Sequence, residues 1–195
     1  NGYYEPHRDE LLYLAEGSHL AWGFMEVPPM LSIFAYMTHL MGGSMFWIRI
    51  WPGLFGGATF ILAGQILLSL GGRKLGLLLL YLPFLCGVYL RLFFLFQPNA
   101  LEVFFDTFCA FALIRFIQRR DSKWLYVFGA CAGLGMLSKY SVGVFLLSLV
   151  IGLLLTEQRK ILFNRHSWYA SLIGFVLFLP NLIWQIRHGL PVVYH

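Results

Sequence analysis

Residues 44–70 read SMFWIRIWPGLFGGATFILAGQILLSL, an apolar run that a single charged side chain, Arg49, interrupts. A helix that crosses the hydrocarbon core of a bilayer needs roughly 20 such residues. A strand of a membrane barrel would alternate apolar and polar positions, and this run does not. In lipid, a lone segment can satisfy its backbone groups only as a helix. We therefore expect residues 44–70 to form a membrane-spanning α-helix.

Five further apolar runs follow along the chain. They cover residues 75–95, 101–118, 124–138, 141–155 and 167–184. The composition agrees, because 59% of the 195 residues are hydrophobic and only 12% are charged, against about 25% charged residues in soluble domains. So few charges argue against a soluble enzyme, a disordered chain or a coiled coil. The predicted fold is all-α, a polytopic bundle of about six transmembrane helices.

The N-terminal region is the polar exception. Five of the nine acidic residues lie in residues 1–43. A short amphipathic helix is predicted within residues 9–22, and a second short helix at about 30–41, after two prolines. We thus expect an outer-face loop with juxtamembrane helices at 1–43, followed by a transmembrane bundle at 44–195, in a chain truncated at both ends.

The basic residues divide unequally between the two sides of this bundle. Loops 71–74, 119–123 and 156–166 hold eight Lys and Arg residues, whereas the loops on the other side hold three. By the positive-inside rule, the first set of loops faces the cytoplasm. The acidic N-terminal region then faces the periplasm. The chain is predicted to be a multi-pass protein of a bacterial inner membrane, surrounded by membrane lipids, with its site on the outer face.

Acidic residues in the N-terminal region are candidates for chemistry. Asp9 and Glu10 stand beside the apolar side of the first short helix, where carboxylates can supply a general base and a cation ligand. Glu26 precedes Pro28-Pro29, whose fixed backbone would orient its side chain. Both groups also suit an ordinary helix start, where the helix dipole favours acids. The residues alone leave these two interpretations open.

Further polar residues follow at the outer ends of the predicted spans. Asn99 can cap a helix, while Glu102 and Asp106 share one helix face. Acids within a span usually face a bundle interior, and Asp106 is the deeper of the two. Lys139 is either a snorkelling anchor or a point charge for a phosphate. The same two interpretations apply to Arg49.

Several familiar kinds of site lack support. Cys86, Cys109 and Cys131 lie in apolar runs without a CxxC pair, so they are expected to be small core residues. The six histidines show no HExxH spacing, and the chain has no Walker A, GxGxxG or GxSxG motif. A preformed zinc site, nucleotide hydrolysis and α/β-hydrolase chemistry are therefore unsupported. No nucleic acid partner is expected.

Taken in order, six short motifs resemble those of one family. They are Asp9-Glu10 before an amphipathic helix, Glu26-Val27-Pro28-Pro29, Arg49-Ile50-Trp51-Pro52 through Gly56, Gly71-Gly72-Arg73-Lys74, Pro98-Asn99-Ala100-Leu101, and the segment from Gly133 to Lys139. The set is similar to that of the dolichyl-phosphate-mannose protein mannosyltransferase-like family of C-type membrane glycosyltransferases, which includes the bacterial aminoarabinose transferases. The resemblance covers nearly all of the chain and places it in the N-terminal half of such a protein.

The resemblance implies a transferase that moves a sugar from a polyprenyl-phosphate donor to a lipid, glycan or protein acceptor. It implies that Asp9 is the essential acid, with Glu10 beside it in the catalytic pair. It also implies that Glu26 binds the lipid phosphate or a divalent metal ion of unknown identity, and that Lys139 belongs to the site. Polyprenyl phosphate is a good leaving group, so the reaction needs a base and positive charge near the phosphate, in a single inverting displacement. The expected residues for binding the substrate or its phosphate are Arg8, Lys139, Asn99 and Glu102.

Two positions depart from the family pattern. Relatives often carry Lys where this chain has Val27, which removes or moves one phosphate contact, and many carry Asp where it has Asn99. Two alternatives to a transferase also stay open. A transporter of lipid-linked sugar would line polar residues through the bilayer, among them Arg49, Arg91 and Asp106. A non-catalytic membrane subunit would use its outer loop to bind a partner.

Overall fold

The computed structural model describes residues 7–194, and the regular elements within that range are all helices. Helix accounts for 76% of the structure, and the described residues form no strand. The elements are α1 (Arg8–Glu16), α2 (Met30–Leu40), α3 (Met45–Ser69), α4 (Lys74–Leu85), α5 (Val88–Leu92), α6 (Pro98–Arg119), α7 (Lys123–Met136), α8 (Val142–Leu154), η1 (Glu157–Ile161), α9 (Arg165–Arg187) and η2 (Pro191–Val193). The all-α prediction is confirmed for this part of the chain.

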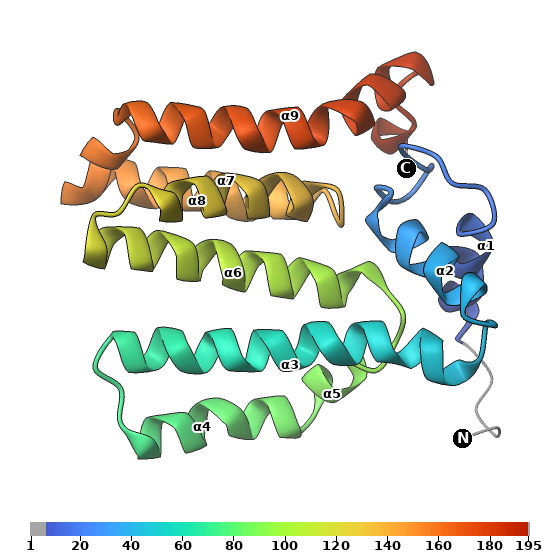
Figure 1. Ribbon diagram of the computed structural model, residues 1–195, viewed down its shortest axis with the longest axis horizontal. Coiled ribbons are helices and arrows are strands. Elements are labelled where there is room, and N and C mark those ends of the chain that lie inside the picture. Colours follow the sequence, from blue (N-terminus) through green and yellow to red (C-terminus); the bar gives the residue numbers. More distant parts are fainter. Residues whose placement is uncertain (1–6, 195) are drawn as a thin grey trace.

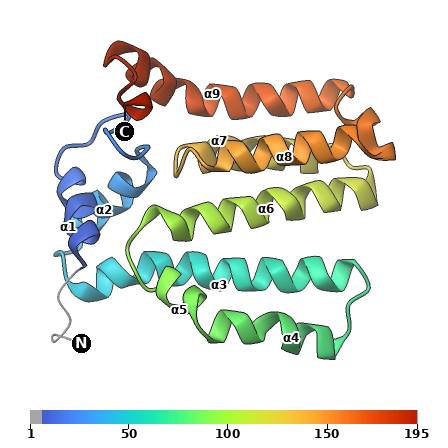
Figure 2. The same cartoon turned by 180° about the vertical axis from the view of Figure 1, so that it is seen from behind.

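The long helices lie side by side, and the N-terminal helices cover one end of them. In Figure 1, the axes of α3, α6, α7 and α9 lie roughly horizontal and side by side, while α1 and α2 lie at their right-hand ends. Figure 2 shows the same arrangement from behind. The most extensive packing joins α7 to α9 and to α6, and α6 to α3, while α4 packs against α3.

Glycines allow α7 and α9 to approach closely. A Cβ atom at Gly129 would lie 2.1 Å from the carbonyl oxygen of Ala170, and one at Gly133 would lie 2.6 Å from that of Gly174. No side chain fits at such distances, so these positions fix the contact between the two helices. Small residues at helix contacts are typical of membrane bundles.

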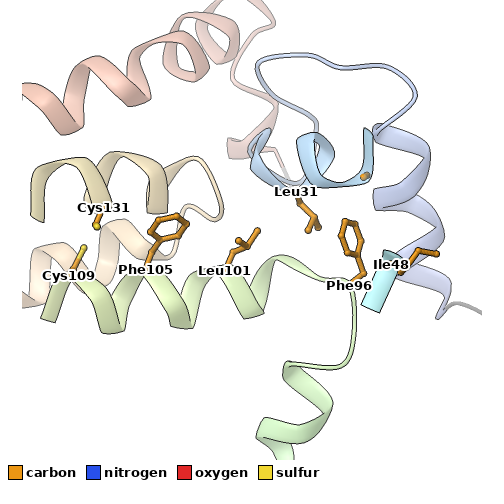
Figure 3. Packing of buried hydrophobic residues seen from close by; sticks show 8 residues of the cluster. Leu31, Ile48, Phe96, Leu101, Phe105, Cys109 and Cys131 are labelled. Atoms are coloured by element: carbon orange, nitrogen blue, oxygen red, sulfur yellow. The ribbon is translucent and has the colours of Figure 1, made fainter. Parts of the chain in front are cut away.

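A buried apolar cluster joins the N-terminal helices to the bundle. Leu31 of α2 packs near Phe96 and Leu101, which lie before and within α6 (Figure 3). Further along α6, Cys109 points toward Cys131 of α7, and both thiols are free and buried. The prediction of small core cysteines is therefore confirmed for these two residues, whereas Cys86 is exposed.

Two helices, α3 and α9, are long and apolar enough to cross a membrane. Most of the predicted spans have a helix of similar extent, but the one at 75–95 is interrupted. There α4 ends at Leu85, Cys86 is extended, and Gly87 adopts a φ of +81° before α5 begins. The run is apolar apart from Arg91, so hydropathy does not reveal the break at Gly87, whose positive φ glycine adopts readily. Passage of all six segments through a bilayer stays a prediction.

The first short helix is also shorter than its predicted range. It ends at Glu16, and Gly17, which follows it, packs closely against α2, where a Cβ atom would lie 2.6 Å from Cβ of Ala35. The second helix, Met30–Leu40, agrees with the expected 30–41.

The charges separate between the two ends of the bundle as the topology predicts. The connections from α3 to α4, from α6 to α7 and from α8 to α9 all lie at the end opposite α1 and α2 (Figure 1). These three connections carry the eight basic residues counted above. The acidic N-terminal region, with α1 and α2, lies at the other end, together with the start of α6 and the turn between α7 and α8. All of the sequence-predicted site residues therefore lie at one end.

Candidate active site

A buried ion pair fixes the first helix to the bundle. His7 is the N-cap of α1, and its backbone N–H donates to Glu10 Oε2 at 2.7 Å, which closes a capping box. Glu10 is fully buried, with 0% of its surface exposed. Arg49 of α3 donates from both Nη atoms to the two Glu10 oxygens, and the Nη2–Oε2 distance is 2.9 Å. The backbone N–H of Phe96 donates to Glu10 Oε1 at 2.5 Å.

These contacts occupy both carboxylate oxygens of Glu10. Arg49 is held in turn, because Nη1 also donates to the carbonyl of Phe94 at 2.9 Å and the guanidinium lies 4.3 Å from the Phe94 ring centre. In this arrangement no part of the Glu10 carboxylate is exposed to a substrate. The geometry argues against the catalytic role expected for Glu10 and favours a positioning role, in which it joins α1, α3 and the segment before α6.

The neighbouring carboxylate, Asp9, faces the other way. Its side chain is 39% exposed, and Gln97 Nε2 donates to Asp9 Oδ2 at 3.2 Å. Arg8 Nε lies 3.7 Å from Oδ1, and His7 Nδ1 lies 3.6 Å from Oδ2. Asp9 is therefore oriented by one amide donor, lies near positive charge, and still has a face open to a substrate.

A second polar cluster lies where α6 begins. Lys139, in the turn between α7 and α8, donates from Nζ to Asn99 Oδ1 and to Glu102 Oε2, each at 2.7 Å. Ser141 Oγ donates to Glu102 Oε1 at 2.5 Å. One turn further along α6, Asp106 has a buried oxygen with no hydrogen-bond partner among residues 7–194. Three of the predicted phosphate-binding residues thus come together around the Lys139 ammonium.

The turn Gln97-Pro98-Asn99 connects the two clusters. Gln97 donates to Asp9, and Asn99, two positions later, accepts from Lys139. Positions two apart in a chain are separated by at most about 7 Å between Cα atoms. A carboxylate with an open face and a lysine ammonium therefore flank one short turn, although they are 130 positions apart in the sequence.

Glu26 occupies a separate place on the rim. It is exposed, whereas Val27, Pro28 and Pro29 after it are buried. The segment is fixed by its backbone, since Phe24 N–H donates to Val27 O at 3.1 Å and Met30 N–H donates to Leu137 O at 2.9 Å. The rigid proline segment expected from the sequence is present, but Glu26 makes no hydrogen bond or ion pair with the other described residues.

Acids near this rim affect one another without forming a metal site. Burial, and then the charge of Glu26, raise the pKa of Glu16 from 4.5 to about 7. Within residues 7–194 no group of three His, Cys, Asp or Glu side chains is arranged to hold a cation. A divalent ion at Glu26 would need ligands from the substrate or from other parts of the protein, and it stays a prediction.

A buried polar network behind the Lys139 turn was not predicted from the sequence. Tyr140 Oη donates to Asn181 Oδ1 at 3.2 Å and accepts from Gln185 Nε2 at 2.8 Å. Asn181 Nδ2 donates to the carbonyl of Trp22 at 2.7 Å. The spacing of Asn181 and Gln185, four apart on an apolar helix, was the available signal. The network ties α9 to both the Lys139 turn and the segment that leads to Glu26.

Comparison with known proteins agrees with the resemblance drawn from the motifs. The chain is 29% identical over 197 residues to lipid A galacturonosyltransferase RgtD of Rhizobium johnstonii, an alignment that covers 96% of this chain and 40% of that protein. The chain therefore spans less than half the length of this relative. No solved structure matches the present chain. The profile described as dolichyl-phosphate-mannose-protein mannosyltransferase matches residues 26–184. Because that match covers most of the sequence, the chain belongs to the dolichyl-phosphate-mannose-protein mannosyltransferase family.

Proposed function

We propose that the protein is a membrane glycosyltransferase that moves a sugar from a polyprenyl-phosphate donor to a hydroxyl group of a lipid, glycan or protein acceptor. Family membership supports the reaction class. The observation that carries the proposal is the turn Gln97-Pro98-Asn99, which has Asp9 on one side and Lys139 on the other. A base and a cation are the two groups that this reaction requires.

Asp9 is the proposed general base. The acceptor oxygen forms a bond to the anomeric carbon while its proton passes to the Asp9 carboxylate. Gln97 keeps that carboxylate oriented, and its 39% exposure leaves room for the incoming hydroxyl. Glu10 and Arg49 act indirectly, because their buried ion pair holds the helix that carries Asp9.

Lys139 is the proposed partner of the leaving group. As the bond between the anomeric carbon and the phosphate oxygen breaks, the electron pair stays with the phosphate, and a positive charge next to that oxygen lowers the barrier. Arg8, which is 95% exposed and next to Asp9, can add charge from the solvent side. Attack and departure on opposite faces of one carbon give inversion.

We further propose that this end of the bundle faces the outside of a bacterial inner membrane, across which the chain passes several times. The basic loops at the opposite end support this orientation through the positive-inside rule. A transporter would instead need polar groups along the whole length of the bundle. The clusters around Asp9 and Lys139 lie at one end, which favours chemistry at a membrane surface.

The direct test supplies donor and acceptor together. The full-length protein in its native membranes is incubated with radiolabelled polyprenyl-phosphate sugars, and the lipid and protein fractions are separated. Label should move to one acceptor fraction from at least one donor, and membranes that lack the protein should show no such transfer. Equal labelling with and without the protein would contradict the proposal.

A further inference from the structure

The carboxylate of Glu102 is held by two donors from one turn. Lys139 Nζ donates to Oε2 at 2.7 Å, and Ser141 Oγ donates to Oε1 at 2.5 Å. An ammonium and a hydroxyl that converge on one oxyanion are also the donor set that binds a phosphate. The position of Glu102 is therefore that of an internal anion in an anion-binding turn.

We propose that Glu102 occupies the place of the donor phosphate when the site is empty, so that the phosphate and the Glu102 carboxylate compete for Lys139 and Ser141. This inference rests on the proposed function. It makes Ser141 a further phosphate-binding residue, and it changes the role of Glu102 from a phosphate ligand to a competitor.

The charges explain why the exchange is required. The side chains of Lys139 and Glu102 are only 35% and 20% exposed, and a half-buried ammonium needs a counter-ion while no substrate is present. A phosphate brought to the same ammonium would lie next to the carboxylate, and two like charges at that distance repel each other. Glu102 must therefore move away from Lys139 as the phosphate arrives.

The competition matters most for release of the product. The donor is a phosphodiester with one negative charge, whereas the released polyprenyl monophosphate carries roughly 1.5 to 2 charges at neutral pH. The product would thus bind Lys139 more tightly than the donor does. A carboxylate that returns to Lys139 and Ser141 weakens the binding of donor and product by the same factor, and it thereby promotes release of the more tightly bound product.

The test measures phosphate affinity in the Glu102→Gln variant of the full-length protein, reconstituted in nanodiscs. Gln keeps the size of Glu102 and one acceptor oxygen, but it removes the charge and replaces the second acceptor with an NH2 donor. We expect farnesyl monophosphate to bind Glu102→Gln about tenfold more tightly than wild type, the factor expected for one charge-assisted hydrogen bond. Inorganic phosphate should show the same relative gain at weaker affinity, and farnesol should show none, which separates the headgroup from the chain.

Two further variants make the result specific. Asp121→Asn removes the carboxylate of another acid–lysine pair, Asp121–Lys123, at the opposite end of the bundle, and should leave the affinity unchanged. When it is combined with Glu102→Gln, Ser141→Ala should weaken the binding of farnesyl monophosphate, because the phosphate loses the Ser141 donor. If Lys139→Met abolishes binding while Glu102→Gln binds like wild type, the competition is refuted and the proposed transferase stands. A gain that is equally large for farnesol would also refute it.

Discussion

Gln97 Nε2 lies 3.2 Å from Asp9 Oδ2, so the residue just before α6 holds the carboxylate that stands near the start of the chain. Two positions later, Asn99 accepts from Lys139. A single turn thus orients groups from the first helix and from the turn between α7 and α8. Both clusters contact this one short segment, which is why we treat them as parts of one site.

The Glu10–Arg49 pair should be the main determinant of how firmly α1 is held. Arg49→Met leaves the buried Glu10 carboxylate without its counter-ion, and breaking a buried pair costs about 3–5 kcal/mol. We expect a lower unfolding midpoint in detergent and faster proteolysis of α1. Transfer should fall as well, because Asp9 loses its support.

A matched substitution separates this effect from the loss of any arginine. Arg91 is exposed on α5, so Arg91→Met should change the unfolding midpoint little. The double variant Glu10→Gln with Arg49→Met removes the unpaired charge and should recover part of the stability. Equal destabilisation by Arg49→Met and Arg91→Met would show that the buried pair is not what holds α1.

The contact between α7 and α9 should tolerate no side chain at Gly129. A Cβ atom there would lie 2.1 Å from the carbonyl oxygen of Ala170, so Gly129→Ala must push the helices apart. Overpacking of this kind costs about 1–3 kcal/mol. Gly152→Ala on α8 is the control, since nothing lies within 4 Å of a Cβ atom at that position. Thermal unfolding of the two variants in the same detergent should separate them clearly.

The raised pKa of Glu16 predicts a pH dependence of stability. Burial and the charge of Glu26 raise this pKa from 4.5 to about 7, so the folded protein binds the proton more tightly than the unfolded chain does. Stability should therefore fall as pH rises from about 4.5 to about 7 and become level above that. Glu16→Gln should lack this component. Unfolding midpoints at pH 5 and pH 8 measure it, and identical pH profiles for wild type and variant would contradict it.

Much of the fold follows from local sequence signals. The apolar runs predict the helices because a continuous apolar surface needs no knowledge of its partner, and the basic loops mark one end of the bundle. The break at Gly87 could not be predicted from the sequence, because hydropathy contains no information about backbone conformation. The short helix predicted within residues 9–22 is present as α1, Arg8–Glu16, whereas the close contact of Gly17 with Ala35 is tertiary and has no local signal.

The site could be predicted only in outline. The motifs identify Asp9, Asn99 and Lys139 as candidates, but their grouping around one turn depends on tertiary packing. Glu10 and Arg49 form an ion pair although they are 39 positions apart, so no local sequence pattern predicts the pair. One signal was present, since a charge within an apolar run must find a partner. Which acid would be enclosed and which left open, Glu10 or Asp9, depends on the helix face that meets α3.

The rate of a single sugar transfer by Asp9→Asn tests the central claim most directly. Asn keeps the shape and a hydrogen-bond acceptor for Gln97 but cannot take a proton at neutral pH. With enzyme in excess over labelled polyprenyl-phosphate sugar, the transfer rate should fall by about 10²–10⁴-fold, the usual contribution of a general base. The unfolding midpoint and the affinity for farnesyl monophosphate should stay close to wild type. A single-turnover rate equal to that of wild type would contradict the assignment of Asp9 as the base.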